Sequence, residues 1–256
     1  MLRSILARLA AHEPEPPPPV PPRVPLGQRL YAVGDIHGRD DLLAQLVERI
    51  EADDAARGPA ETTIILLGDL VDRGPASAAV VERAHALAQR RRVRLLAANH
   101  EEVMLNALGG SIEALRFFCR IGGEETIASY GMSRDAMRGM AFDELLPRFQ
   151  VAVPPHHADF LRSAEDWIAI GDYVFVHAGI RPGVALAAQK PADLRWIREP
   201  FLDDPRWHGA MIVHGHTITP AVDARPNRLG IDTGAYASGR LTAVGLEGPE
   251  RWFLEG

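Results

Sequence analysis

The sequence has one cysteine, one lysine and no long apolar stretch. Because Cys119 is the single cysteine, the chain cannot form an internal disulfide, which suits a reducing compartment. No apolar run approaches the ~20 residues that a membrane-spanning helix needs. Lys190 is the only lysine. The net charge is −6, whereas proteins that bind nucleic acid typically carry an excess of basic residues. We therefore expect a cytoplasmic protein with no transmembrane segment and no nucleic-acid partner.

The N-terminal residues differ in composition from the rest of the chain. Eight of the twelve residues between Pro14 and Pro25 are proline, which favours an extended segment that cannot pack as helix or sheet. We therefore predict a flexible tail over residues 1–27 and one domain over residues 28–256. The tail is expected to be a spacer, and docking to a proline-reading partner is the alternative.

From residue 28 onward, apolar patterns typical of strands alternate with patterns typical of helices. The first predicted strands lie at residues 29–33, 62–67 and 93–97, and the helices between them at 40–54 and 77–90. This β-α-β-α-β order implies a right-handed, largely parallel sheet. A mostly helical segment is predicted over about 101–166. Further strands are predicted at 173–176, 211–213 and 229–231, with closing antiparallel strands at 241–246 and 251–254.

Three short polar motifs follow the first three predicted strands. They are Gly34–Gly38 (GDIHG), Gly68–Gly74 (GDLVDRG) and Asn99–Glu101 (NHE). Open α/β sheets bind ligands in the crevice beyond the carboxyl ends of their strands, so we expect the three motifs to meet there. Asp, His and Asn side chains in such a crevice suit two hard or borderline divalent metals. Two such ions ~3.5–4 Å apart are suited to breaking phosphate esters.

The candidate metal ligands lie at the ends of five predicted strands. They are Asp35, His37, Asp69, Asn99, His177 and His216. A spacing of two residues lets Asp35 and His37 turn toward the same face of an extended loop. Asp69 could bridge both ions through its two carboxylate oxygens. Any one of these residues has an ordinary structural explanation, but six ligands at five strand ends exceed what chance placement would give.

Hydrolysis of a phosphate ester also needs a proton for the leaving group, and His100 is the candidate donor. Histidine titrates near neutral pH, with an unperturbed pKa of ~6.5. A nearby carboxylate would orient the ring and favour its protonated form, and Asp72 is the candidate for that partner. Such a pair would protonate a departing alkoxide. Arg73, which follows Asp72, can present a planar fork to phosphate oxygens.

Taken together, these motifs resemble those of the metal-dependent phosphoprotein phosphatases, within the calcineurin-like metallophosphoesterases. The motifs of that family are GDxHG, GDxVDRG, GNHE, HAG and a late GH block. In this sequence they stand as GDIHG at 34–38, GDLVDRG at 68–74, ANHE at 98–101, HAG at 177–179 and HGHT at 214–217. The likeness extends over about 30–254. It is greatest to small bacterial and phage serine/threonine phosphatases, through GGEET at 122–126 and LRWIRE at 194–199.

The resemblance implies a two-sheet α/β/β/α sandwich of the metallophosphoesterase type with a helical insertion. It implies a first metal on Asp35, His37 and Asp69, a second on Asp69, Asn99, His177 and His216, an acid pair of Asp72 and His100, and phosphate binding by Arg73, Arg198 and Asn99. Hydroxide held by the metals would attack phosphorus directly, without a covalent enzyme intermediate. Manganese is the ion that the bacterial relatives usually use, although Fe or Zn would also suit this ligand set.

Two positions depart from the family pattern. Ala98 replaces a glycine, which would strain the backbone by about 1 kcal/mol if that position had a positive φ. We expect an ordinary φ and no effect. Ile218 stands where broader metallophosphoesterases carry a further histidine, which favours the phosphoprotein phosphatase branch. We expect His214 to support a ligand rather than bind metal. The same role is open to Asp232.

The sequence favours removal of phosphate from phosphoserine and phosphothreonine proteins, with the phosphoprotein as substrate and partner. The alternative is hydrolysis of dinucleoside polyphosphates such as Ap4A. Bacterial enzymes of that class resemble a variant with GDLVARG and NHD, whereas this chain has Asp72 and Glu101 at those positions. A catalytically inactive binding module would be expected to lack ligands, and none is missing.

Overall fold

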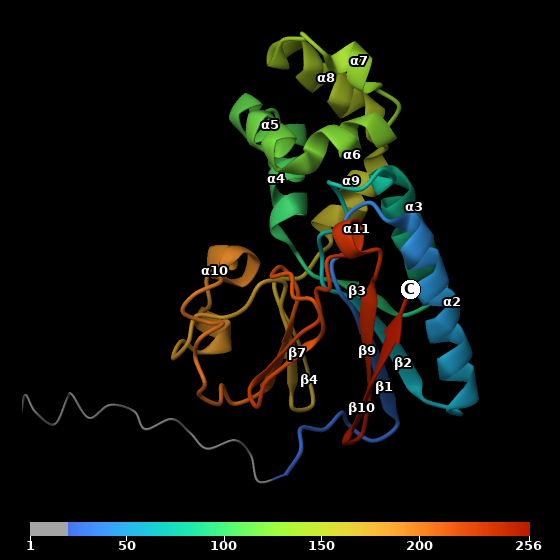
Figure 1. Cartoon of the computed structure of the whole chain (residues 1–256), viewed down its shortest axis with the longest axis vertical. Coiled ribbons are helices and arrows are strands. Elements are labelled where there is room, and N and C mark those ends of the chain that lie inside the picture. Colours follow the sequence, from blue (N-terminus) through green and yellow to red (C-terminus); the bar gives the residue numbers. More distant parts are fainter. Residues whose placement is uncertain (1–19) are drawn as a thin grey trace, which may run out of the picture.

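The computed structural model of the protein describes residues 20–256 (Figure 1). The predictions made for residues 1–19, which include most of the proline-rich docking segment, lie outside the described residues. Val24 is buried, and its N–H donates a hydrogen bond to the carbonyl of Gly248. The last residues of the predicted tail therefore pack against the domain. No helix in the described part of the chain is both long enough and apolar enough to cross a membrane.

Two five-stranded sheets form the centre of the fold. The first has the strand order β10-β9-β1-β2-β3. The bounds of its strands are Gln28–Val33 for β1, Glu61–Leu66 for β2, Val93–Leu95 for β3, Thr242–Glu247 for β9 and Glu250–Glu255 for β10. Strands β1, β2 and β3 are parallel, as the sequence predicts, and β9 and β10 extend the sheet in antiparallel pairing.

The second sheet has the order β4-β5-β6-β8-β7. The bounds of its strands are Ile168–Ile170 for β4, Tyr173–Phe175 for β5, Met211–His214 for β6, Asp223–Ala224 for β7 and Arg228–Gly230 for β8. Strands β5, β6 and β8 run parallel, and β4 and β7 form antiparallel edges. The sequence does not predict the edge strands β4 and β7.

Helices cover the outer face of each sheet, as Figure 1 shows. They are α2 (Asp40–Ala56) and α3 (Ser77–Ala88) on the first sheet and α10 (Pro191–Trp196) on the second. Side chains of β1 alternate accordingly, because Leu30 and Ala32 pack between the sheets while Tyr31 and Val33 pack under the helices. These four layers confirm the predicted α/β/β/α sandwich.

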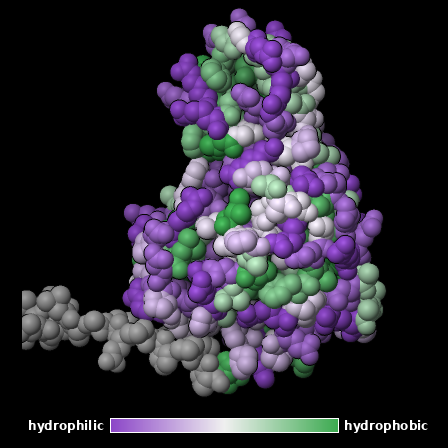
Figure 2. All heavy atoms as spheres, in the orientation of Figure 1, coloured by the Kyte–Doolittle hydropathy of each residue, from purple (hydrophilic) through white to green (hydrophobic). Residues whose placement is uncertain are grey.

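A helical segment lies above the upper edges of both sheets (Figure 1). Its members are α4 (Asn99–Leu108), α5 (Ile112–Phe118), the π-helix η1 (Cys119–Gly123), α6 (Glu124–Ser129), α7 (Arg134–Met137), α8 (Phe142–Ala152) and α9 (Pro155–Arg162). Later short helices are the 3₁₀-helix η2 (Leu186–Ala188) and α11 (Ala235–Ser238). The face of the molecule in Figure 2 is mostly hydrophilic, and its apolar side chains form small separate groups.

The backbone between β3 and α4 shows whether alanine is strained at position 98. Ala98 has φ of −117° and ψ of 165°, an extended conformation open to any residue. The expectation that alanine is tolerated here is therefore correct. The adjacent constraint falls on Gly68, whose φ is +100° and where an added Cβ would lie 2.3 Å from the Cβ of Ala98.

We predict opposite roles for these two small residues. Ala98→Gly should lower the free energy of unfolding by about 0.5–1 kcal/mol or more, because glycine adds chain entropy to the unfolded state and the substitution removes a buried methyl group. Gly68→Ala should cost more, because it combines a left-handed backbone with a steric clash. Urea denaturation of both variants measures the difference. A gain in stability for Ala98→Gly would mean that alanine strains this junction.

Candidate metal centre

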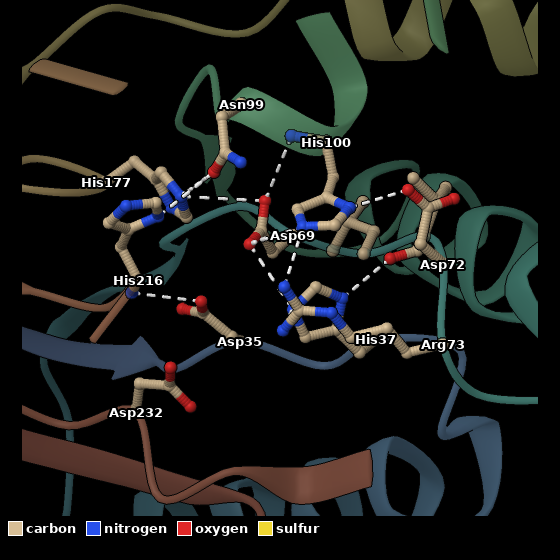
Figure 3. A network of polar contacts seen from close by, with 12 residues as sticks. Asp35, His37, Asp69, Asp72, Arg73, Asn99, His100, His177, His216 and Asp232 are labelled. Carbon is tan, nitrogen blue, oxygen red and sulfur yellow. Dashed lines mark hydrogen bonds and ion pairs between the residues drawn. The ribbon is translucent and has the colours of Figure 1, made fainter. Parts of the chain in front are cut away.

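The predicted metal ligands meet at the upper ends of the two sheets, beneath the helical segment (Figure 3). All six are buried. Asp35 and His37 follow β1, Asp69 follows β2, Asn99 begins α4, His177 follows β5 and His216 follows β6. The parallel strands deliver their carboxyl ends to one place, which brings together residues far apart in sequence.

Asp69 occupies the centre of this group and faces both halves of it. Its Oδ2 lies 3.3 Å from Nε2 of His37, and its Oδ1 lies 3.5 Å from Nε2 of His177. Ligand atoms of Asp69, His177 and His216 lie within 4.8 Å of one another, and so do those of Asp69, His37 and His100. The arrangement suits a carboxylate that bridges two cations. The second of these groups contains His100, which the sequence analysis places as proton donor.

Backbone carbonyls fix the orientation of two of the histidines. Nδ1 of His37 is 2.8 Å from the carbonyl oxygen of Val71, and Nδ1 of His177 is 2.9 Å from that of Leu67. Each Nδ1–H therefore donates to a carbonyl and leaves the lone pair of Nε2 directed toward Asp69. This is how metal-binding histidines are usually oriented. Burial also lowers the pKa of His177, which keeps its imidazole neutral.

Hydrogen bonds cannot pair every polar atom in the site. Because the proton of His177 is on Nδ1, its Nε2 faces Oδ1 of Asn99 at 2.8 Å with no hydrogen between them, whereas Nδ1 of His216 lies 3.1 Å from the same oxygen and can donate to it. Nε2 of His216 and Oδ1 of Asp35 are buried and have no hydrogen-bond partner among the described residues. A buried polar atom without a partner destabilises the folded protein, and bound divalent cations would supply the missing partners. The donor set therefore fits metal binding.

Negative charge is concentrated beside Asp35. Burial, together with the neighbouring carboxylates of Asp232 and Asp69, raises the pKa of Asp35 well above its usual range. Oδ2 of Asp35 accepts the N–H of His216 at 2.9 Å, and Asp232 accepts the N–H of Gly234 at 2.9 Å. Asp232 thus adds charge next to a predicted ligand, a role that the sequence left open. A bound cation would restore the ionised form of Asp35.

Asp72 and His100 form the pair that the sequence predicts. Nδ1–H of His100 donates to Oδ2 of Asp72 at 2.6 Å (Figure 3). We expected the carboxylate to favour the protonated ring, but burial lowers the pKa of His100 and raises that of Asp72 well above its usual range. In this dry setting burial disfavours two separated charges on the pair.

Of the two predicted phosphate-binding arginines, one lies in the site and one at its border. Arg73 donates to Nε2 of His37 at 2.9 Å and to Nε2 of His100 at 3.0 Å. Its guanidinium also lies 4.9 Å from the ring centre of Tyr236, which the sequence analysis did not single out. Arg198 is exposed after α10, and its positive charge helps to lower the pKa of His216, although burial contributes more.

The backbone is strained where the site is built. The five non-glycine residues of the described chain with positive φ are His37, Asp69, Asp72, Arg73 and His216. Left-handed backbone costs ~1–2 kcal/mol per such residue. All five are predicted site residues, and surrounding hydrogen bonds must hold them in place.

Glu101 provides several of those hydrogen bonds, a role that the sequence analysis missed. Its carboxylate accepts the N–H groups of Asp69 at 2.9 Å, Leu70 at 2.7 Å and Val71 at 3.2 Å. Burial and the neighbouring Asp69 raise the pKa of Glu101 to about 8. The signal was its place in the NHE motif, directly after a predicted ligand and a predicted proton donor.

The helical segment holds the other end of the same loop. Thr126 accepts the N–H of Asp72 at 2.8 Å, and its hydroxyl donates to the Asp72 carboxylate at 2.6 Å. Ser77 accepts the same N–H at 3.0 Å. The carbonyl of Gly122 accepts the N–H of Arg73 at 3.1 Å. Gly122 and Thr126 belong to the GGEET stretch quoted for the resemblance, which supplied no role for them.

His214 lies apart from the ligand atoms. Its Nδ1 is 3.0 Å from the carbonyl oxygen of Gly215, and its ring packs edge-on against Phe201 with 5.1 Å between ring centres. Burial lowers the pKa of His214 to about 4. It belongs to neither group of ligand atoms around Asp69.

Curated relatives share a recurring name. A symmetrical bis(5'-nucleosyl)-tetraphosphatase of Paracidovorax citrulli is 27% identical over 84% of this chain and 91% of its own length. An asymmetrical bis(5'-nucleosyl)-tetraphosphatase of Anoxybacillus flavithermus is 24% identical over 83% of this chain and 88% of its own length. For the symmetrical enzyme of Acidovorax ebreus, at 34% identity, the match covers 60% of this chain and 44% of that relative.

Solved structures with other names share the fold. A proposed diadenosine tetraphosphatase superposes with a TM-score of 0.61 at 18% identity, over 91% of this chain and 98% of its own. A cold-active protein-tyrosine phosphatase of Shewanella superposes with a TM-score of 0.51 at 18% identity, over 91% of this chain and 83% of its own. At these identities the likeness establishes the fold alone.

The family model of the calcineurin-like phosphoesterases matches residues 28–228, which is most of the chain. This match agrees with the two-sheet sandwich and with the ligand groups around Asp69. The chain is thus a phosphoesterase-type hydrolase of a metal-dependent class. It belongs to the calcineurin-like phosphoesterase family.

Proposed function

We propose that this chain hydrolyses bis(5'-nucleosyl) tetraphosphates with the help of two divalent metals. The assignment of this substrate rests on the shared name of relatives that match more than four fifths of the chain. The names include both symmetrical and asymmetrical enzymes, so the proposal concerns the substrate and not the bond that is cleaved. The comparisons favour this substrate over the phosphoprotein that the motifs alone suggest.

The residues proposed to hold the metals are Asp35, His37, Asp69, Asn99, His177 and His216. When bound, two such ions lower the pKa of water and neutralise phosphate charge. Manganese is the ion that we propose, as expected from the sequence. Arg73 would turn its guanidinium from the histidines toward phosphate oxygens, and Arg198 would approach them from the border beside His216.

A second candidate is hydrolysis of phosphoserine and phosphothreonine in proteins, and the Asp72–His100 pair favours it. A serine or threonine alkoxide is a poor leaving group and gains much from a positioned proton donor. A nucleotide phosphate ionises near pH 6 and gains less from one. The pair at 2.6 Å is thus most useful for a phosphate monoester.

The first test compares the two substrates directly. We expect metal-free protein supplied with Mn²⁺ to show a higher kcat/KM for diadenosine tetraphosphate than for a phosphoserine or phosphothreonine peptide. His177→Ala should lose both activities, because the same site would be responsible. A higher kcat/KM for the peptide would overturn the first proposal in favour of the second.

The proton-donating pair has its own test. Asp72→Asn and His100→Asn should each lower kcat on a phosphoserine peptide by about 10²–10⁴-fold and act far less on p-nitrophenyl phosphate, whose leaving group needs no proton. Asp143→Asn, an exposed Asp-to-Asn change on α8, serves as the control. Equal losses on both substrates would exclude leaving-group protonation by this pair.

Glutamine substitutions at Glu101 and at its neighbour Glu102 form a matched test of the support for Asp69. Glu101→Gln should weaken Mn²⁺ binding by about 10–100-fold, because an amide cannot accept all three N–H groups of the loop that carries Asp69. Glu102→Gln should leave Mn²⁺ binding unchanged, since Glu102 instead bonds Arg195 and Trp196. Titration of apoprotein with Mn²⁺ measures both, and equal affinities would contradict the role of Glu101.

A further inference from the structure

Three histidines outside the metal centre come together between two helices. His85 lies on α3, and His156 and His157 lie in the first turn of α9, about seventy residues later. The rings of His85 and His156 have centres 5.2 Å apart. Glu82, three residues before His85 on α3, faces the same place, as expected for positions i and i+3 of a helix.

Ligand atoms of Glu82, His85 and His156 lie within 4.8 Å of one another. Nε2 of His156 is 2.9 Å from Oε2 of Glu82. Glu82 and His156 are exposed and His85 is half-buried, so a cation in solution could reach them. Two imidazoles and one carboxylate form a donor set that zinc uses, with a fourth position left for water.

The side chains of Tyr130 and His157 orient the carboxylate of Glu82. The hydroxyl of Tyr130 donates to Nδ1 of His157 at 2.9 Å, and Nε2–H of His157 donates to Oε2 of Glu82 at 2.8 Å. His157 is 3% exposed, unlike its neighbour His156. Oε1 of Glu82 takes no part in these two hydrogen bonds. Ligands of metal sites are typically oriented by such outer partners.

We propose that Glu82, His85 and His156 form a third divalent-metal site, for a borderline cation such as Zn²⁺, separate from the centre at Asp69. The site would join α3 to α9. Ser77 at the start of α3 contacts the loop of Asp72, and His85 lies about 12 Å further along the helix at 1.5 Å per residue. Zinc would therefore tie the end of the helical segment to a helix that supports the catalytic loop.

Zinc content tests the site. Untagged protein is equilibrated with Zn²⁺, desalted and analysed for bound metal. His85→Ala and His156→Ala should each retain about one equivalent less than the wild type, whereas His208→Ala, a histidine bonded to Asn227, should match the wild type. Circular dichroism checks that the variants fold. The same zinc content in all four proteins would overturn the proposal, whatever the enzymatic substrate proves to be.

A second measurement needs no variant. Anomalous diffraction at the zinc edge from wild-type crystals grown with Zn²⁺ should show a peak between Glu82, His85 and His156. This peak should be additional to any peak beside Asp69. If a variant of the cluster fails to fold, the anomalous map of the wild-type crystal still tests the proposed third site. Absence of density at the cluster, with zinc present at Asp69, would exclude the third site.

Discussion

The carboxylate of Glu101 holds the loop on which the rest of the site depends. It accepts three successive N–H groups, those of Asp69, Leu70 and Val71. The same loop carries Asp69, Asp72 and Arg73, all with positive φ. Such a backbone is unstable alone, at ~1–2 kcal/mol per residue, and persists because these hydrogen bonds outweigh the strain. The carboxylate proposed to bridge the metals, the pair proposed to donate a proton and the arginine proposed to bind phosphate thus share one support.

The helical segment completes that support from outside the sheets. Thr126 of α6 accepts the N–H of Asp72, and the carbonyl of Gly122 accepts the N–H of Arg73. A segment inserted between β3 and β4 therefore contributes directly to the catalytic loop.

The strands and helices that position the site could be predicted because their patterns are long and regular. Strands β1 and β2 are buried apolar runs, and α2 and α3 show one apolar face each. The order of these elements is enough to bring GDIHG and GDLVDRG to the same edge. Strands β4 and β7 were not predicted, and they are defined by antiparallel pairing at the edges of the second sheet. The sequence also did not show that burial lowers the pKa of His100, against the expectation that a carboxylate would favour its protonated ring.

The sequence by itself determined which residues could bind metal and the parallel strand order that gathers the first of them, whereas the two-sheet sandwich was implied by the resemblance of its motifs to a family. Motif spacing and strand periodicity are local properties, so they can be read from the amino-acid sequence alone. Only the tertiary structure decided how Asp69 faces His37 and His177, what Glu101 supports and which histidines meet between α3 and α9. Those contacts join residues tens of positions apart. Their distances and burial depend on how the layers pack, and no local pattern encodes that.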